Sequence, residues 1–226
     1  VTTQGTGTTG GTITLENTDT SGSNGDFLGK INFKGNDSSS GASGTRAAIE
    51  AKVVSNFGST ELHFKTAASG ASATDAMVMS SDGEVTKPLQ PAFSARNNAT
   101  QSNIDNNTLI LFGAETFDIG SNFASDHTFT APVTGKYQLN AMVRMDNLDS
   151  SGTWVAMTIQ TSNRNYTMLN SASTLDTDSG YWTFTVTALA DLDANDTANV
   201  LFNKSGGSAT GDATDGAAHF NGFLAC

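Results

Sequence analysis

The chain has 226 residues and a mass of 23.4 kDa, which is enough for one large all-β domain or two smaller ones. Only 15 % of the residues are charged and Gly is abundant, so the composition disfavours helices and suits short strands joined by turns. The net charge of −11 argues against binding to nucleic acid or anionic lipid, and no apolar run is long enough for membrane insertion.

The two ends of the chain bear on its origin and its redox chemistry. Val1 stands where an initiator Met is expected, so we interpret the chain as a fragment of a longer protein, and its first residues do not resemble a signal peptide. The single cysteine, Cys226, excludes an internal disulfide framework and a thiolate metal cluster. We expect a buried free thiol near a strand end, with a disulfide between copies as the alternative.

Residues 1–87 consist of very short alternating segments separated by runs of small polar residues. Each segment carries few apolar residues, so one copy buries little apolar surface for the backbone entropy that it loses. We therefore expect an N-terminal β shaft whose core is shared among several copies, with a tight turn at Ser81–Glu84. The expected strands are Ile13–Leu15, Leu28–Lys34, Ala48–Val53, Glu61–Lys65 and Met77–Met79.

A short connector, residues 88–91, follows the shaft. Pro88 and Pro91 stiffen this connector and resist incorporation into a strand on either side. We therefore expect a domain boundary here, with the shaft at residues 1–87 and a head domain at residues 92–226.

Longer and richer alternating segments fill residues 92–226. In Gly135–Met145, every second residue from Tyr137 to Met145 is apolar, as in a strand with one buried face. A polar loop is expected at Asn97–Asn107. The many strands predict a two-sheet β-sandwich or jelly roll. The expected strands are Ala92–Arg96, Leu109–Phe112, His127–Pro132, Gly135–Met145, Trp154–Gln160, Tyr181–Leu189, Ala198–Phe202 and His219–Ala225.

Four segments of the head, in order, resemble the globular head of complement component 1q. They are Ala92–Ala95, Phe129–Tyr137 (Phe-x-Ala-Pro-x-x-Gly-x-Tyr), the turn that starts at Leu192, and Phe220–Leu224 (Phe-x-Gly-Phe-Leu). Leu139 and Asn195 depart from this pattern, since the family has Phe and Gly at those places. The resemblance implies a jelly roll shared with the tumour necrosis factor superfamily, and a homotrimer.

Residues 1–87 resemble the Gly-, Ser- and Asn-rich β shafts of bacteriophage tail fibres, and they lack the Gly-x-y period of collagen. Together the two resemblances imply the distal part of a phage tail fibre or spike, an extracellular part of the virion. Its partner would be a glycan or protein receptor on the bacterial host surface. The alternatives are a structural capsid or tail decoration fibre whose head drives trimerisation, and a secreted bacterial adhesin.

We expect no enzymatic activity. The three histidines, His63, His127 and His219, are far apart in the sequence and match no zinc-binding pattern. The chain also lacks a nucleophile elbow and a phosphate-binding glycine loop. Carboxylates are plentiful, so a glycoside hydrolase with two acids is the enzymatic alternative, although no two acids can be paired in an identifiable groove.

Calcium is the candidate cofactor, and two acidic segments have the oxygen ligands to hold it. Asp191–Asp196 has oxygen ligands at alternating positions but fails the full calcium-loop pattern, and a turn between strands explains it equally. Gly211–Gly216 is a second acidic loop. Relatives of the resembled fold can hold calcium near the trimer axis, which implies a weak site here. The candidate ligands are Asp193, Asp196, Asp212 and Asp215.

One polar loop has the character of a recognition element. It combines a lone Arg with an amphipathic ring on a β scaffold, whereas Trp154, Trp182 and Tyr181 occur in strands and are expected in the core or at the trimer interface. The predicted ligand-binding residues are Asn163, Arg164, Asn165 and Tyr166.

Overall fold

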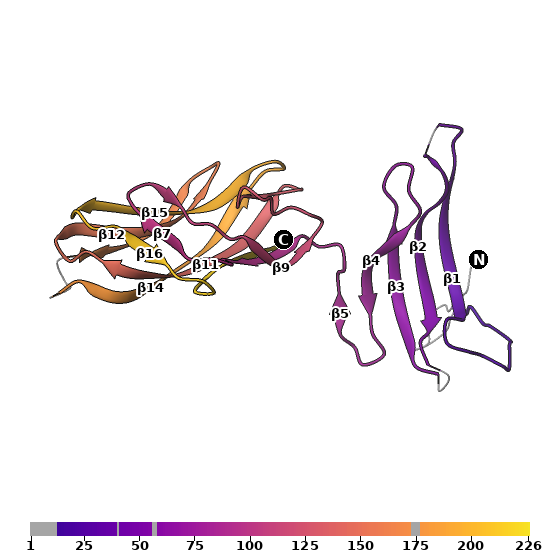
Figure 1. The fold of residues 1–226 in the computed structure, drawn as a ribbon. Coiled ribbons are helices and arrows are strands. Elements are labelled where there is room, and N and C mark those ends of the chain that lie inside the picture. Colours follow the sequence, from indigo (N-terminus) through magenta and orange to yellow (C-terminus); the bar gives the residue numbers. More distant parts are fainter. Residues whose placement is uncertain (1–12, 40, 56–57, 173–176) are drawn as a thin grey trace, which may run out of the picture. The chain divides into compact units, whose positions relative to one another are not determined.

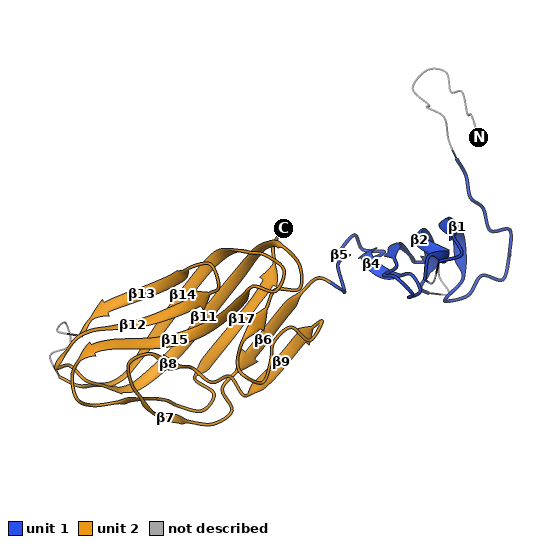
Figure 2. Cartoon of the chain, turned by 90° about the horizontal axis from the view of Figure 1, so that it is seen from above, with its two compact units in different colours: residues 1–89 blue, residues 90–226 orange. Residues whose placement is uncertain are grey.

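The computed structural model describes residues 13–39, 41–55, 58–172 and 177–226, and the chain forms two compact units, residues 1–89 and 90–226 (Figure 1, Figure 2). The described residues form β-strands and no α-helix, which confirms the predicted all-β class. None of them belongs to a helix long and apolar enough to span a membrane.

Unit 1, residues 1–89, is a single antiparallel sheet in which the strands follow one another in chain order. Ile13–Leu15 is not part of it, contrary to prediction. Leu15 instead lies against the sheet at Gly29, where an added Cβ would be 2.6 Å from the Leu15 Cβ. The expected turn at Ser81–Glu84 joins the last two strands. The strands are β1 (Phe27–Asn36), β2 (Ser43–Val53), β3 (Thr60–Thr66), β4 (Thr74–Met79) and β5 (Val85–Thr86).

Unit 2, residues 90–226, is a sandwich of two sheets, as the predicted jelly roll requires. The smaller sheet has the order β10-β15-β12-β13, with β8 also paired to β15; the larger has the order β7-β16-β11-β17-β6-β9, with β14 also paired to β11. The strands are β6 (Ala92–Arg96), β7 (Gln101–Ile104), β8 (Thr108–Leu109), β9 (Ala114–Ile119), β10 (Phe129–Thr130), β11 (Gly135–Leu148), β12 (Gly152–Thr161), β13 (Asn165–Ser171), β14 (Ser179–Leu192), β15 (Thr197–Gly206), β16 (Gly211–Ala213) and β17 (Ala218–Leu224).

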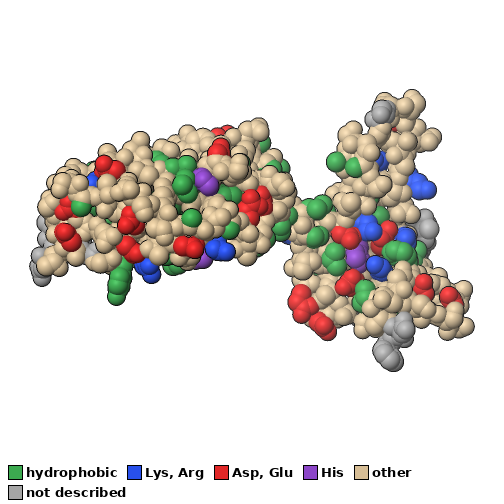
Figure 3. Space-filling model, in the orientation of Figure 1, with side chains coloured by type: hydrophobic (Ala, Val, Ile, Leu, Met, Phe, Trp, Pro, Cys, Tyr) green, Lys and Arg blue, Asp and Glu red, His purple; other side chains and the backbone are tan. Residues whose placement is uncertain are grey.

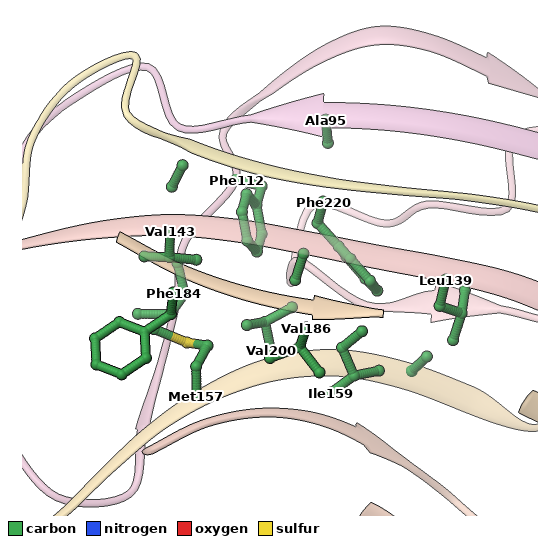
Figure 4. Packing of buried hydrophobic residues seen from close by; sticks show 14 of the residues in the cluster. Ala95, Phe112, Leu139, Val143, Met157, Ile159, Phe184, Val186, Val200 and Phe220 are labelled. Atoms are coloured by element: carbon green, nitrogen blue, oxygen red, sulfur yellow. The ribbon is translucent and has the colours of Figure 1, made fainter. Parts of the chain in front are cut away.

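The core of unit 2 lies between the two sheets, where alternate residues of facing strands interdigitate (Figure 4). Phe93 is at its centre, with its ring centroid 4.6 Å from that of Phe129 and 5.1 Å from that of Phe123. Gly222 of β17 has to be glycine, because a Cβ there would lie 2.9 Å from both the Phe93 ring and the carbonyl oxygen of Gln138. This close approach explains the glycine of the Phe-x-Gly-Phe segment.

Four predictions for unit 2 are wrong in detail. β7 forms inside the expected loop Asn97–Asn107, and β16 forms inside the expected acidic loop Gly211–Gly216, because these two short segments pair with each other. Of the expected strand Leu109–Phe112, only Leu109 lies in a strand, in β8. Cys226 is exposed instead of buried, because β17 ends at Leu224 and the last two residues lie outside the sheet.

Candidate functional site

The two ends of unit 2 carry different polar side chains and hydrogen bonds. We call the end where the chain enters the unit the near end (Figure 2). The backbone N–H of Leu224 donates to the carbonyl of Pro91 at 3.0 Å, and that of Lys136 donates to the carbonyl of Cys226 at 2.7 Å. The first and last residues of unit 2 therefore meet at the start of β11. The far end is where β11 finishes, at Leu148.

The predicted ligand-binding residues lie at the near end, where β12 turns into β13. The Asn163 side-chain amide donates to the carbonyl of Asp191 at 2.9 Å and to Asp196 Oδ2 at 2.8 Å. The backbone N–H of Arg164 donates to Thr161 Oγ1 at 3.0 Å, while the side chain of Arg164 is exposed. The structure thus joins Asn163 to the acidic turn between β14 and β15 and leaves the Arg164 side chain at the surface.

Asn165 and Tyr166 were predicted to lie in a loop. They instead begin β13, because they pair with the end of β12. The half-buried Tyr166 lines a groove of about 360 Å³ between β13 and β14, the strands at one side of the sandwich. The groove is also lined by Thr167, Met168, Thr185, Val186 and Thr187. Its lining mixes hydroxyl and apolar groups.

The four candidate calcium ligands are divided between the two ends. At the near end, Asp196 Oδ2 accepts the backbone N–H of Asp193 at 2.8 Å, so this carboxylate closes a turn. At the far end, Asp212 lies on β16 and Asp215 in the loop after it. The described ranges contain no cluster of three acidic, His or Cys side chains that could hold a metal ion.

The far end also contains a set of hydrogen bonds that the sequence did not single out. Asp149 Oδ2 accepts the backbone N–H groups of Ser208 and Ala209 at 2.7 and 2.8 Å, and its Oδ1 accepts the N–H and hydroxyl of Ser151 at 2.8 and 2.6 Å. These donors, the Ser151 hydroxyl first, hold the pKa of Asp149 well below its usual range. One carboxylate therefore joins the β11–β12 turn to the β15–β16 loop.

A second carboxylate extends this arrangement. Asp212 accepts the backbone N–H of Asn103 at 3.0 Å through Oδ1 and the side-chain amide of Asn147 at 3.1 Å through Oδ2. Asn103 and Asn147 have φ angles of 59° and 60°, a conformation that Asn adopts more readily than most residues. We call Asn103, Asn147, Asp149, Ser208, Ala209 and Asp212 the far-end cluster. Of these residues only Asp212 was selected from the sequence, as a candidate calcium ligand, and the turn-forming composition of Asn147–Gly152 could have indicated Asn147 and Asp149.

The outward face of the larger sheet exposes large apolar side chains. Leu189 of β14 and Phe223 of β17 are both in register with Gln138 of β11, and they are 59 % and 47 % exposed. Phe117 of β9 and Met142 of β11, 49 % and 42 % exposed, lie farther along the same face. We call these four residues the outward patch. Apolar side chains that gather on one exposed face often mark a surface that another protein covers.

Comparison with known proteins agrees with the sandwich of unit 2. The family model described as the C1q domain matches residues 92–225. The resemblance predicted for this region is confirmed, whereas the tail-fibre resemblance of residues 1–87 stays a prediction. None of the curated proteins gives a match.

Solved structures that match include the globular domain of a zebrafish complement 1qA protein, which is 19 % identical (61 % of this chain and 98 % of that chain covered, TM-score 0.44). Murine APRIL at pH 8.0 is 13 % identical (60 % and 98 % covered, TM-score 0.43). The Eiger TNF from S. frugiperda is 12 % identical (61 % and 94 % covered, TM-score 0.45).

Proposed function

Because this chain belongs to the C1q domain family, we propose that it is a homotrimeric adhesin, the distal part of a phage tail fibre or spike. In this proposal unit 1 is the shaft and unit 2 is the head, which binds a glycan or protein receptor on the bacterial host surface. The protein acts outside the cell as part of the virion, and it binds without catalysing a reaction.

The observation that carries the proposal is the outward patch. Its four large apolar side chains lie on the face of the larger sheet that does not contact the smaller sheet, so a neighbouring copy can cover them. Burial of that face between three copies stabilises the assembly through the hydrophobic effect. A trimer then repeats one weak receptor contact three times, which raises the apparent affinity without any new contact.

We assign the receptor contact to the far-end cluster. Its loops are already held by Asp149 and Asp212, so little conformational entropy is lost when a ligand binds. The earlier candidates, Arg164 and Tyr166, lie at the end where the chain enters unit 2. The far-end cluster lies at the opposite end of unit 2 from its first residues.

Light scattering on the whole chain tests the trimer. We expect about 70 kDa, three times the 23.4 kDa of one copy, and a mass near 23 kDa would overturn the proposal. Changing Leu189 and Phe223 together to Asp should reduce the mass, because a carboxylate is costly to bury at an interface. Leu169→Asp is the matched control, since Leu169 is 58 % exposed on β13 in the smaller sheet. The control should keep the mass of the trimer.

Binding of the labelled protein to a panel of bacterial cells tests the adhesin. Ser208→Arg with Ala209→Arg retains the backbone N–H groups that Asp149 accepts but blocks the far-end surface. We expect this variant to bind cells at least tenfold more weakly, while Arg164→Ala with Tyr166→Ala binds like the unchanged protein. The reverse result would move the contact to the near end. A trimer that binds no bacterial strain would favour the structural decoration fibre instead.

A further inference from the structure

The strand register of unit 1 collects its large apolar side chains on one face of the sheet. Ile31 of β1, Ile49 of β2 and Phe64 of β3 are neighbours in one row that continues to β4. A second row runs from Ala51 through Leu62 to Val85 of β5. The apolar face of unit 1 consists of Ile31, Phe33, Ile49, Ala51, Leu62, Phe64, Met77, Met79 and Val85, none of which is charged.

The opposite face of the same sheet carries charged side chains that pair with one another. Lys65 Nζ lies 2.9 Å from Glu50 Oε2, and His63 lies between Asp75 (Nδ1–Oδ1 2.9 Å) and Glu61 (Nε2–Oε2 3.2 Å). Glu50 and His63 are buried within this network. Figure 3 shows the Lys, acidic and His side chains gathered on the visible face of unit 1. The buried charged groups of that face are therefore paired within the sheet.

The apolar face, by contrast, is open. Ile31 is 43 % exposed, Phe33 54 % and Val85 50 %, values typical of surface residues. Leu15 covers only one edge and leaves an apolar hollow of about 140 Å³ beside it. A cavity of about 150 Å³ lined by apolar side chains can admit benzene, so the hollow has room for one side chain from another copy. The twelve residues that precede Ile13 contain a single apolar residue, Val1.

The dimensions of the sheet suit three copies. Five strands about 4.8 Å apart make a sheet roughly 24 Å wide, and three such sheets in a triangular prism leave an inscribed radius of about 7 Å. Sheets packed face to face are about 10 Å apart, so each contributes about 5 Å of side chain. Phe33, Phe64, Met77 and Met79 are long enough to fill the slightly larger interior. Because the face is uncharged, identical copies can meet without repulsion between like charges.

We propose that three copies of this chain pack the apolar faces of unit 1 around a common axis, so that the core of unit 1 forms only between copies. This inference rests on the trimer of the proposed function and adds a second interface, separate from the outward patch of unit 2. The charged face with Glu50 and His63 then lies on the outside of the shaft.

Cross-linking of the whole chain tests which face meets another copy. Cys226→Ser removes the only thiol, and Ile31→Cys then introduces one on the apolar face, with Asn32→Cys as the control on the opposite face of β1. Each variant has a single thiol, so a short bismaleimide can join only two different copies. We expect covalently joined pairs from Ile31→Cys at least tenfold in excess of those from Asn32→Cys. Equal yields would overturn the inference.

A charge on each face supplies the second readout. Ile31→Asp should increase hydrogen exchange of the β2 and β3 amides at least tenfold, whereas Asn32→Asp should leave the exchange rates unchanged. Exchange that responds to Ile31→Asp without cross-links at Ile31→Cys would mean that another part of the same chain covers the face, and this result too overturns the inference. A monomeric protein in light scattering overturns the trimer itself, while a trimer with equal behaviour of both faces overturns only the shaft core.

Discussion

Unit 1 and unit 2 share the same alternation of apolar and polar residues, but they bury their apolar side chains to different extents. All twelve of the largest fully buried side chains among the described residues are in unit 2, including Tyr137, Phe93 and Phe220. Among the described residues of unit 1, the buried apolar side chains are Ala48 and Val53, and two charged or polar residues, Glu50 and His63, are buried as well. Unit 2 therefore has a core between its own two sheets, whereas the described part of unit 1 is a single sheet.

The difference shows what period-2 alternation can and cannot predict. Alternation indicates a strand with one apolar face, and it does so equally for β2 in unit 1 and β11 in unit 2. Whether the same chain covers that face depends on the presence of a second sheet. The following substitutions test this comparison.

The largest effect is expected in the core of unit 2. Phe93→Ala should lower the free energy of unfolding of unit 2 by about 3–5 kcal/mol, because it removes the ring that stacks on Phe123 and Phe129. Urea unfolding followed by tryptophan fluorescence measures it selectively, since Trp154 and Trp182 are both in unit 2. Phe33→Ala in unit 1 is the control and should leave this transition in place. A loss below about 1 kcal/mol for Phe93→Ala would contradict the two-layer core.

A smaller loss is expected when the charged face of unit 1 is disturbed. Glu50→Gln removes the carboxylate that lies 2.9 Å from the ammonium group of Lys65 and leaves only Asp75, at 3.7 Å, which should cost about 2–3 kcal/mol in the free energy of unfolding of unit 1. Hydrogen exchange of the β2 and β3 amides measures this free energy separately from unit 2. Glu16→Gln, at an exposed carboxylate of the same unit, should change nothing. Equal effects of both substitutions would mean that the buried ion pair does not stabilise the sheet.

The smallest effect is local and depends on pH. The pKa of Asp149 is lowered in the folded protein, so its contribution is complete above its ordinary value of 3.8 and is lost as the pH falls through the lowered pKa. The Ser208 and Ala209 amides should therefore lose protection from hydrogen exchange in acid, as measured by NMR relative to the intrinsic exchange rate at each pH. Asp149→Ala should remove the protection at every pH, because alanine has no side-chain acceptor, and Asp215→Ala, at an exposed far-end carboxylate, should preserve it. Protection in the unchanged protein that is independent of pH would rule out this role of Asp149.

Much of the fold can be predicted from the sequence because long alternating segments leave few alternatives. Two segments were expected as strands and are strands: Gly135–Met145 lies in β11, and Tyr181–Leu189 lies in β14. The missed strands β7 and β16 are short, and their sequences have no apolar alternation that could indicate a strand. Each is stabilised by pairing with the other, more than 100 residues away in the chain. Ile13–Leu15 shows the opposite error, because its alternation is satisfied by packing of Leu15 on the sheet without pairing of the backbone.

The candidate site was less predictable, because its geometry comes from contacts between distant residues. The polar character of Asn163–Tyr166 is visible in the sequence, but the hydrogen bond from Asn163 to Asp196 depends on how the β12–β13 and β14–β15 turns meet. The far-end cluster likewise needs Asp149 to reach amides 59 and 60 residues later. Residue type alone indicates neither end of the head.

The exposed Cys226 makes backbone hydrogen bonds with Lys136, at the opposite end of the head from the far-end cluster. It is the only cysteine of the chain, so a maleimide reagent attaches at one defined position. A biosensor surface coupled through this thiol would hold every copy in the same orientation, with the far-end loops directed into solution. The single thiol of Cys226 therefore serves as an attachment point for measuring adhesion on an oriented layer, and the far-end loops need no added tag.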